Sequence, residues 1–219
     1  IGRLVGSEMC IRDRSDIDKA TVDNSIPKDK FVIGHYGTFG ADRNSSSLWN
    51  ALKSLADKHP EFKEKLYIEL VGPTDETIMQ SIRDLGLGDN LHYTPYLPHH
   101  SCISKMKRAS ILLVVLNGNL NEEGRVTGKI FEYLATGNII LGIGSKTSDC
   151  AKVINESHAG KMIGFDEQSH IEESVYDYFQ QYLNGQLNDT LILDESRLRF
   201  TRENLTKDLG SMLDAMISE

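Results

Sequence analysis

The sequence predicts an α/β fold with one doubly wound parallel sheet of about six strands and helices on both faces. Three observations support this fold class. Short apolar segments alternate with segments of helical periodicity from residue 31 onward. Segments 111–116 and 139–143 are almost continuously apolar, as central strands of a parallel sheet must be. Glycine or proline ends several of these segments.

The first half of the alternation contains three strands and two helices. The predicted strands are short β-type runs: 31–36, 66–71 and 91–94. The helices between them carry apolar residues at helical spacing, over 48–56 and 78–85. Pro95 and Pro98 bracket the loop that follows the third strand.

The second half continues with a short helix over 101–108 and a strand over 111–116. A helix over 127–136 follows, with Thr127 as its N-cap and Gly137 as its C-terminal stop. The remaining elements are strand 139–143, helix 149–156, strand 160–165, and helices 168–184 and 195–217. Such β-α repeats are typical of a Rossmann-like sheet, in which ligands bind beyond the carboxyl ends of the strands.

Composition and charge exclude several classes of protein. The 219 residues are 39% apolar and 26% charged, as in ordinary globular proteins. The net charge of −8 disfavours nucleic-acid binding, and no apolar run approaches the roughly 18 residues that cross a bilayer. The 3 cysteines are widely spaced, which indicates a reducing compartment, and no Cys/His spacing resembles a zinc site. We therefore expect a cytoplasmic protein without a transmembrane segment, a nucleic-acid partner or a metal.

Two segments precede the alternating region. Residues 1–14 resemble a translated sequencing adapter, and we interpret them as an artefact, with a short native helix or strand as the alternative. Residues 15–30 are polar and are interpreted as a linker into the first strand. The predicted domain then extends over 31–219.

The familiar phosphate-binding motifs do not fit. Gly37 and Gly40 after the first strand have the wrong spacing for a dinucleotide fingerprint. The stretch from Gly124 to Lys129 is one residue too short for a P-loop, and Ile130 lacks the hydroxyl that binds magnesium. An ordinary P-loop NTPase and a nicotinamide dehydrogenase are both poor interpretations.

The most informative cluster of residues lies at the start of the helix predicted after the strand 111–116. A Gly-Lys step at a helix start presents backbone N–H groups to an anion, and Lys129 adds a positive charge, as does Arg125. Glu132 lies three residues later on the same helix face, where its carboxylate could accept hydrogen bonds from a ribose. This pattern fits a nucleoside diphosphate. The alternative is a salt bridge between Lys129 and Glu132 on a solvated helix face.

Residues 127–141 resemble the donor-site helix of retaining, family-4-type glycosyltransferases with the GT-B fold. The likeness continues over 31–52, 67–72, 91–98 and 196–209, in the order of that family's motifs. A GT-B enzyme has two Rossmann-like domains that face a cleft. The resemblance implies that this chain is the C-terminal, nucleotide-sugar donor domain, with the N-terminal acceptor domain missing.

The resemblance implies a basic pair at the donor diphosphate. Lys129 matches one diphosphate ligand, next to Thr127 and Gly128 at the helix start. On the loop after the first strand the family has Gly-Arg-x-x-x-x-Lys, whereas this chain has Thr38 after Gly37. Arg43 stands at the lysine position, and its guanidinium suits a phosphate. Lys129 and Arg43 are thus the candidate catalytic residues, which stabilise the charge on the leaving group.

The resemblance also implies which residues contact the ribose, the nucleobase and the sugar of the donor. Glu132 would grip the ribose, Tyr96 and Leu97 would cup the nucleobase, and Gly72 would let a loop approach the ligand closely. The family's first glutamate, which contacts the sugar, is replaced by Gly124, eight residues before Glu132. His35, on the first strand near the site, is either a ligand or a packing residue.

The implied activity is metal-independent, retaining transfer of a sugar from a nucleotide diphosphate to a carbohydrate or lipid-linked acceptor, with no further cofactor. The isolated fragment is expected to be inactive, and the full-length protein is expected to be cytoplasmic or peripheral to the inner membrane face. Polysaccharide biosynthesis is the family-level expectation. Two alternatives remain: a nucleotide-sugar epimerase of the same fold, and a non-catalytic nucleotide-binding domain, which Thr38 and Gly124 favour.

Overall fold

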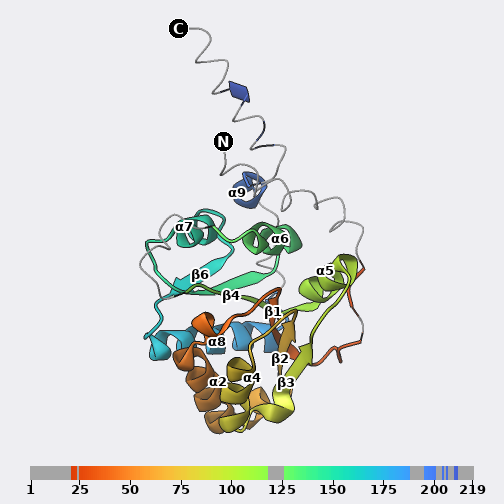
Figure 1. Cartoon of the computed structure of the whole chain (residues 1–219), viewed down its shortest axis with the longest axis vertical. Coiled ribbons are helices and arrows are strands. Elements are labelled where there is room, and N and C mark those ends of the chain that lie inside the picture. The colour runs from red at the N-terminus through yellow and green to blue at the C-terminus, as the bar shows by residue number, and fades with distance from the viewer. Residues whose placement is uncertain are drawn as a thin grey trace.

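The structure is a computed structural model that describes residues 21–23, 25–117, 126–187 and 195–200, together with 204, 206, 210 and 211. A six-stranded sheet lies at its centre, with helices on both faces (Figure 1). The predicted α/β class is therefore confirmed. Residues 1–14, Gly124 and most of the predicted helix 195–217 lie outside the described residues.

Every strand pairing in the sheet is parallel, and the strand order is β3-β2-β1-β4-β5-β6. The strands are β1 (Phe31–Tyr36), β2 (Leu66–Val71), β3 (Leu91–Thr94), β4 (Ile111–Val115), β5 (Ile139–Ile143) and β6 (Gly160–Ile163). The first strand, β1, lies in the middle of the sheet. β2 and β3 follow on one side of it, and β4, β5 and β6 follow on the other side. Doubly wound sheets bind their ligands at such a reversal of strand order.

The two central strands pair over a short stretch only. Gly34 pairs with Leu112 and Ile33 with Ile111, whereas β1 pairs with β2 along its whole length. The ladder between β1 and β4 therefore ends before the carboxyl ends of the two strands. β4 remains anchored there by β5, which pairs with it as far as Val115.

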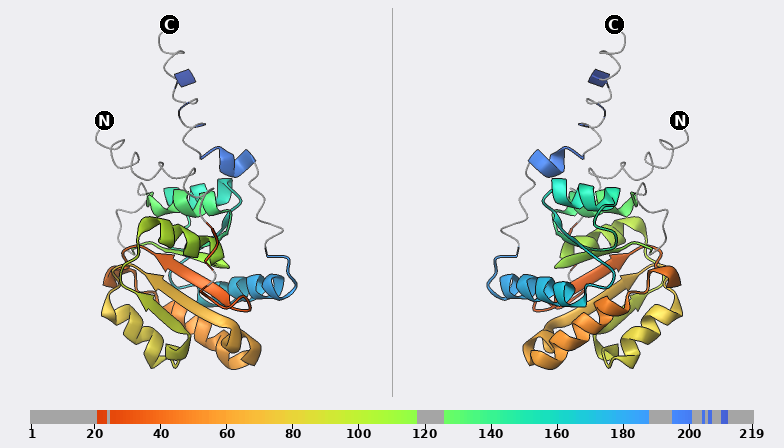
Figure 2. Two further views of the ribbon diagram at one scale, coloured as in Figure 1. Left: turned by 90° about the vertical axis from the view of Figure 1, so that its right-hand side faces the viewer. Right: turned by 90° about the vertical axis from the view of Figure 1, so that its left-hand side faces the viewer.

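Each face of the sheet has its own hydrophobic core. One core is covered by α2 (Ser46–Lys58), α3 (Pro60–Lys65), α4 (Glu76–Asp84) and α8 (Gln168–Leu183). The other is covered by α5 (His99–Arg108), α6 (Lys129–Thr136) and α7 (Asp149–Glu156). The side views show α8 on one side of the sheet and α6 and α7 on the other (Figure 2). The one-turn α9 (Glu195–Leu198) contributes the buried Arg197, which donates a hydrogen bond to the carbonyl of Gly137 at the end of α6.

Several predicted boundaries need correction. α6 begins at Lys129 with Gly128 at the N-cap position and no side-chain cap, so Thr127 is not its N-cap. The Thr127 carbonyl instead accepts the N–H of Ile130. Gly137 ends α6 in the left-handed conformation, with φ of 83°, as predicted. Of the predicted strand 160–165, only Gly160–Ile163 is strand.

The predictions contain no counterpart of α3. This six-residue helix starts at a proline and buries only Phe62, so it shows none of the periodicity by which a helix is found. The predicted helix 101–108 starts earlier, at His99, directly after Pro98. Neither difference moves an element relative to the sheet.

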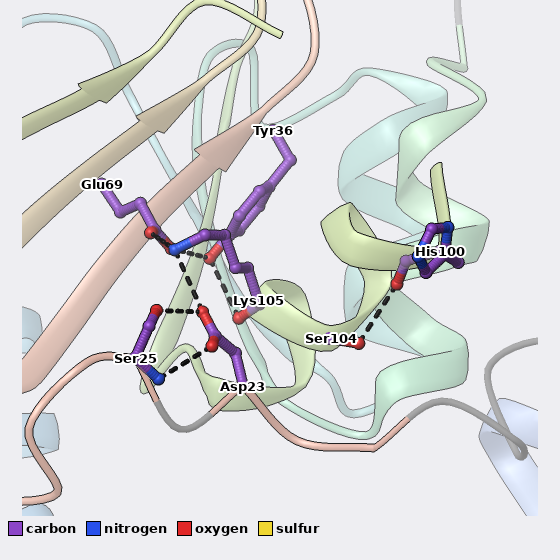
Figure 3. Close-up of polar contacts among 7 residues, drawn as sticks. All are labelled: Asp23, Ser25, Tyr36, Glu69, His100, Ser104 and Lys105. Carbon is purple, nitrogen blue, oxygen red and sulfur yellow. Dashed lines mark hydrogen bonds and ion pairs between the residues drawn. The ribbon is translucent and has the colours of Figure 1, made fainter. Parts of the chain in front are cut away.

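A buried polar cluster connects the segment before β1 to the sheet and to α5 (Figure 3). Glu69 on β2 is 2% exposed, accepts a hydrogen bond of 2.7 Å from the Tyr36 hydroxyl, and forms an ion pair of 2.6 Å with Lys105. Lys105 also pairs with Asp23 at 3.1 Å. Burial by itself would lower the pKa of Lys105, but its contacts with Glu69 and Asp23 raise it. Lys105 is therefore charged, and the cluster fixes the end of β1 against α5.

Candidate functional site

A pocket of about 260 Å³ opens at the carboxyl ends of β1 and β4, where the strand order reverses. Its walls come from the end of β4, the 3-10 turn η1 (Ala41–Arg43) and the start of α6. The lining residues are Arg43, Val114, Val115, Leu116, Asn117, Val126, Thr127 and Lys129. Two cations thus face an apolar wall, and their attraction for an anion is stronger there than in open water.

Lys129 projects from the first turn of α6 toward β1. Its Nζ lies 3.0 Å from Nε2 of His35, and it packs against Gly37, which follows β1. Burial, followed by the positive charge of Arg43, lowers the pKa of Lys129 to about 8, against the opposing effect of Glu132. The ammonium therefore predominates at neutral pH, but it sits where a negative partner would stabilise it further.

His35 lies below Lys129 and is 1% exposed. Its ring stacks on Phe39 with centroids 4.0 Å apart, and its Nδ1 lies 3.1 Å from the carbonyl oxygen of Leu113 on β4. Burial, with the neighbouring charge of Lys129, holds the pKa of His35 well below its usual value. The imidazole is therefore neutral at physiological pH.

Arg43 reaches the pocket from the loop after β1. Its Nε donates a hydrogen bond of 2.8 Å to Oδ1 of Asn117, and a terminal nitrogen donates one of 3.2 Å to the carbonyl of Thr38. These contacts hold the guanidinium beside the end of β4, on the same pocket as Lys129. Thr38 is exposed and accepts the hydrogen bond from Arg43 through its backbone carbonyl, so this contact does not depend on the Thr38 side chain.

The loops after β1 and β2 touch each other through two glycines. Gly37 and Gly72 have φ of 103° and 109°, which strongly favours glycine. A Cβ on Gly72 would lie 2.8 Å from the carbonyl oxygen of Gly37. Gly72 thus allows two loops to pack, and by that contact it supports the segment that holds Arg43.

The two residues before Lys129 contribute backbone to the site, and Thr127 lines the pocket. Gly128 is the N-cap of α6 and has a helical backbone conformation. Glu132 is partly buried one turn along α6 and acts on Lys129 through its charge, but it is not part of the pocket lining. The structure thus places Lys129, Arg43 and Thr127 at one pocket and Glu132 beside it.

The residues expected at the nucleobase lie apart from the pocket. Tyr96 is 78% exposed, and Leu97 packs on the core under α5 and α6. Both follow β3, the edge strand separated from β1 by β2. Gly124, Arg125 and the neighbouring Glu122 and Glu123 lie outside the described residues.

Two features of the site carried little signal in the sequence. Asn117, the partner of Arg43, could have been found from its position directly after the most apolar strand, where doubly wound sheets bind ligands. The contact between His35 and Lys129 joins residues 94 positions apart, so no local pattern indicates it.

A second hollow of about 410 Å³ lies at the edge strand β6 and is more open. Lys146 there pairs at 2.6 Å with Glu167, which also lies 3.5 Å from Nδ1 of His170. Lys146 and Lys161 share this hollow with the carboxylates of Glu167 and Glu173, which makes it a poorer anion site than the pocket at β1 and β4. Among the described residues, no group of three His, Cys, Asp or Glu side chains could hold a metal ion.

No protein-family model matches the sequence, and no curated protein matches it. Solved structures do. Anabaena Alr3699/HepE in complex with UDP is 15% identical with a TM-score of 0.67, and the match covers 95% of this chain and 55% of that one. A glycosyltransferase from Rickettsia africae is 12% identical with a TM-score of 0.67, over 93% and 55% of the two chains. The C-terminal domain of LpcC, a glycosyl transferase group 1 family protein from Francisella tularensis, is 12% identical with a TM-score of 0.55, over 87% and 89%.

The fold is that of one half of a GT-B glycosyltransferase. The chain spans about half the length of the HepE and Rickettsia proteins, and nearly all of the separate LpcC domain. In the described part of the chain, no helix has the length and apolar character needed to span a membrane.

Proposed function

We propose that this chain is the donor-binding domain of a retaining glycosyltransferase that uses a nucleotide-diphosphate sugar. The observation that carries the proposal is the convergence of Lys129 and Arg43 on one pocket at the reversal of strand order. The solved complexes of the similar HepE with UDP and with UDP-glucose support it.

In this proposal the diphosphate lies between Lys129 and Arg43. As the sugar leaves, negative charge grows on the diphosphate, and two fixed cations beside an apolar wall stabilise that charge without a metal. Glu132 accepts hydrogen bonds from the ribose, and the base extends out of the pocket toward Tyr96 and Leu97 on the loop after β3. The acceptor, a carbohydrate or a lipid-linked carbohydrate, is bound by a further domain.

The proposal is tested by calorimetric titration of the chain with UDP, GDP, ADP and dTDP. We expect one diphosphate to bind selectively, and Lys129→Ala and Arg43→Ala each to weaken it by about tenfold or more, because each removes a charged partner of a phosphate. Lys152→Ala is the matched control, since this exposed lysine on α7 does not line the pocket. Equal loss in the control, or no effect of Lys129→Ala, would contradict the donor site.

A second candidate is a nucleotide-binding domain without catalysis, which Thr38 favours. The resemblance expects an arginine there, and Thr38 contacts Arg43 only through its carbonyl in the contacts described above. Thr38→Arg separates the candidates. A transferase that uses this position gains turnover of donor with its acceptor domain present, whereas a binding domain gains only diphosphate affinity.

A further inference from the structure

We propose that His35 is a positioning residue that holds the Lys129 ammonium at the floor of the pocket. This inference rests on the proposed function of the site, but its first test needs no ligand. The sequence leaves His35 open between a ligand and a packing residue. The structure places its Nε2 3.0 Å from Nζ of Lys129.

The hydrogen bonds fix the tautomer of His35. The carbonyl oxygen of Leu113, 3.1 Å from Nδ1, can only accept, so Nδ1 carries the proton. A neutral imidazole then has a lone pair on Nε2, and the nearby ammonium, which can only donate, supplies the hydrogen. The carbonyl of Thr38, 3.4 Å from Nε2, is an acceptor and cannot bond an unprotonated nitrogen. The hydrogen bonds therefore run in one direction: Lys129 donates to His35, and His35 donates to the carbonyl of Leu113.

The position of Leu113 explains why its carbonyl can accept a hydrogen bond from the His35 side chain. The ladder between β1 and β4 ends at Gly34 and Leu112, one residue before His35 and Leu113. The imidazole bridges the two strands where their backbones no longer pair. Its stacking on Phe39 fixes the ring plane, so Nε2 has one direction only.

Packing alone does not account for a histidine here. A phenylalanine would fill the same space against Phe39, but it would leave the carbonyl of Leu113 and the Lys129 ammonium without this hydrogen-bond partner. The groups that face the Lys129 ammonium are Arg43 from η1, Glu132 on α6, Cys102 on α5 and His35 itself. Of these, Arg43 repels the ammonium. His35 is the neutral acceptor whose direction is fixed, and it holds a flexible lysine against that repulsion.

The consequence for the site is preorganisation. A lysine has a long flexible stem, and ordering it at the moment of binding reduces affinity. With Nζ already fixed beside Gly37, the ammonium is in place before the anion arrives. A hydrogen bond to a neutral acceptor also favours the ammonium over the free amine, which keeps Lys129 charged.

The test follows the titration of Lys129 by NMR of its ε-methylene group in the whole chain, without ligand, with the signal assigned through Lys129→Arg. Three variants test separately the polar atom near Nε2, the polar atom near Nδ1 and the stacking of the ring. His35→Gln puts an amide oxygen near the Nε2 position, His35→Asn keeps a polar group near Nδ1 only, and His35→Phe keeps only the stacking. We expect the Lys129 transition near pH 8 in the parent and in His35→Gln. In His35→Asn and His35→Phe it should move down by about one pH unit.

A second measurement titrates UDP into the same proteins. We expect His35→Phe and His35→Asn to weaken binding by about tenfold at pH 7.5, and His35→Gln to restore most of it. A Lys129 transition that is the same in the parent, His35→Asn and His35→Phe would overturn the positioning role. If the transition moves as expected but no nucleoside diphosphate binds the parent, His35 positions Lys129 and the proposed function is wrong.

Discussion

At the scale of single residues, Lys129 is held in a place that is unfavourable for a cation. It is partly buried at the pocket, and the positive charge of Arg43 lies close enough to lower its pKa. His35 offsets part of this penalty by accepting a hydrogen bond. A protein keeps such a group where the function needs it, and the penalty itself can be measured.

Lys129→Met should therefore stabilise the protein at pH 7 by about 1 kcal/mol, while it abolishes diphosphate binding. The pKa of Lys129 is about 8 in the folded protein and 10.5 in its ordinary state. The unfolded chain thus binds more protons between these values, so the parent gains stability as the pH rises from 8 to 10.5. The stabilising effect of the substitution should be largest below pH 8 and absent above pH 10.5.

Urea unfolding of the parent and Lys129→Met at pH 7 and pH 10.5 measures this difference. Lys152→Met, on an exposed position of α7, is the control and should change stability little at either pH. A destabilised Lys129→Met at pH 7 would show that the ammonium is well satisfied without a ligand.

At the scale of elements, the loops after β1 and β2 behave as one unit. Gly37 donates its N–H to Val71 at 2.7 Å, and Gly72 donates to Thr94 at 2.9 Å, so the parallel ladder extends past the strand ends. The isolated bridge between Phe39 and Thr74 continues the same pairing. The loop that carries Arg43 is thereby fixed to the sheet.

Gly72→Ala should destabilise the protein by about 2–4 kcal/mol and weaken diphosphate binding. The new methyl group would lie 2.8 Å from the Gly37 carbonyl oxygen, at a φ of 109°. Gly86→Ala is the matched control, since Gly86 has a φ of 73° and nothing within 4 Å of the added methyl. The control should cost only the conformational penalty of about 1 kcal/mol and leave binding unchanged.

Thermal or denaturant unfolding, together with UDP titration, compares the effects of Gly72→Ala and Gly86→Ala on stability and on binding. The expected result is a larger loss of stability in Gly72→Ala, accompanied by weaker binding in that variant alone. Equal losses in both variants would mean that the contact between the two loops contributes nothing beyond backbone strain.

At the scale of the whole molecule, the charged cluster of Glu69, Lys105 and Asp23 joins parts of the chain that are far apart in sequence. It links the segment before β1 to α5, and through Tyr36 it reaches the end of β1 (Figure 3). The Tyr133 hydroxyl on α6 accepts the backbone N–H of Tyr36 at 3.0 Å. The entering segment and the helix that carries Lys129 are thus connected through one strand end.

Lys105→Met should destabilise the protein by about 3 kcal/mol, because it leaves the carboxylate of Glu69 buried beside an apolar group. The double variant Lys105→Met, Glu69→Leu should recover most of that loss, since the Tyr36 hydroxyl keeps the carbonyl of residue 105 as an acceptor at 3.1 Å. Denaturant unfolding of the two variants and the parent provides the comparison. A double variant as unstable as the single one would mean that the ion pair contributes more than its burial costs.

Much of the architecture could be predicted from the sequence because its signals are local. The apolar segments at 111–116 and 139–143 identify buried strands, and Gly137 identifies a helix end. α3 is not predicted because a helix with one buried residue has no periodic pattern. The residue type of Thr127 predicts an N-cap, but the helix begins one position later than a threonine cap requires.

The site was predictable in part, for a related reason. Lys129 and Arg43 lie at the ends of predicted elements, so topology alone brings them to the same edge of the sheet. The bond between Lys129 and His35 depends on how α6 packs over β1, which periodicity does not specify. The places of Tyr96 and Leu97 depend on a loop at the edge strand, and topology leaves that loop at a distance from the pocket.

The early end of the ladder between β1 and β4 has a consequence for how such a protein can diversify. In the proposed function the diphosphate lies at the pocket beside the end of this ladder, where Gly37 and the pairing of the neighbouring strands hold the backbone in place. The loop that would contact the base starts from β3, so it can change in sequence without altering that pocket. Natural selection, or a laboratory library confined to this loop, can therefore change which base is bound while the contacts to the diphosphate stay the same.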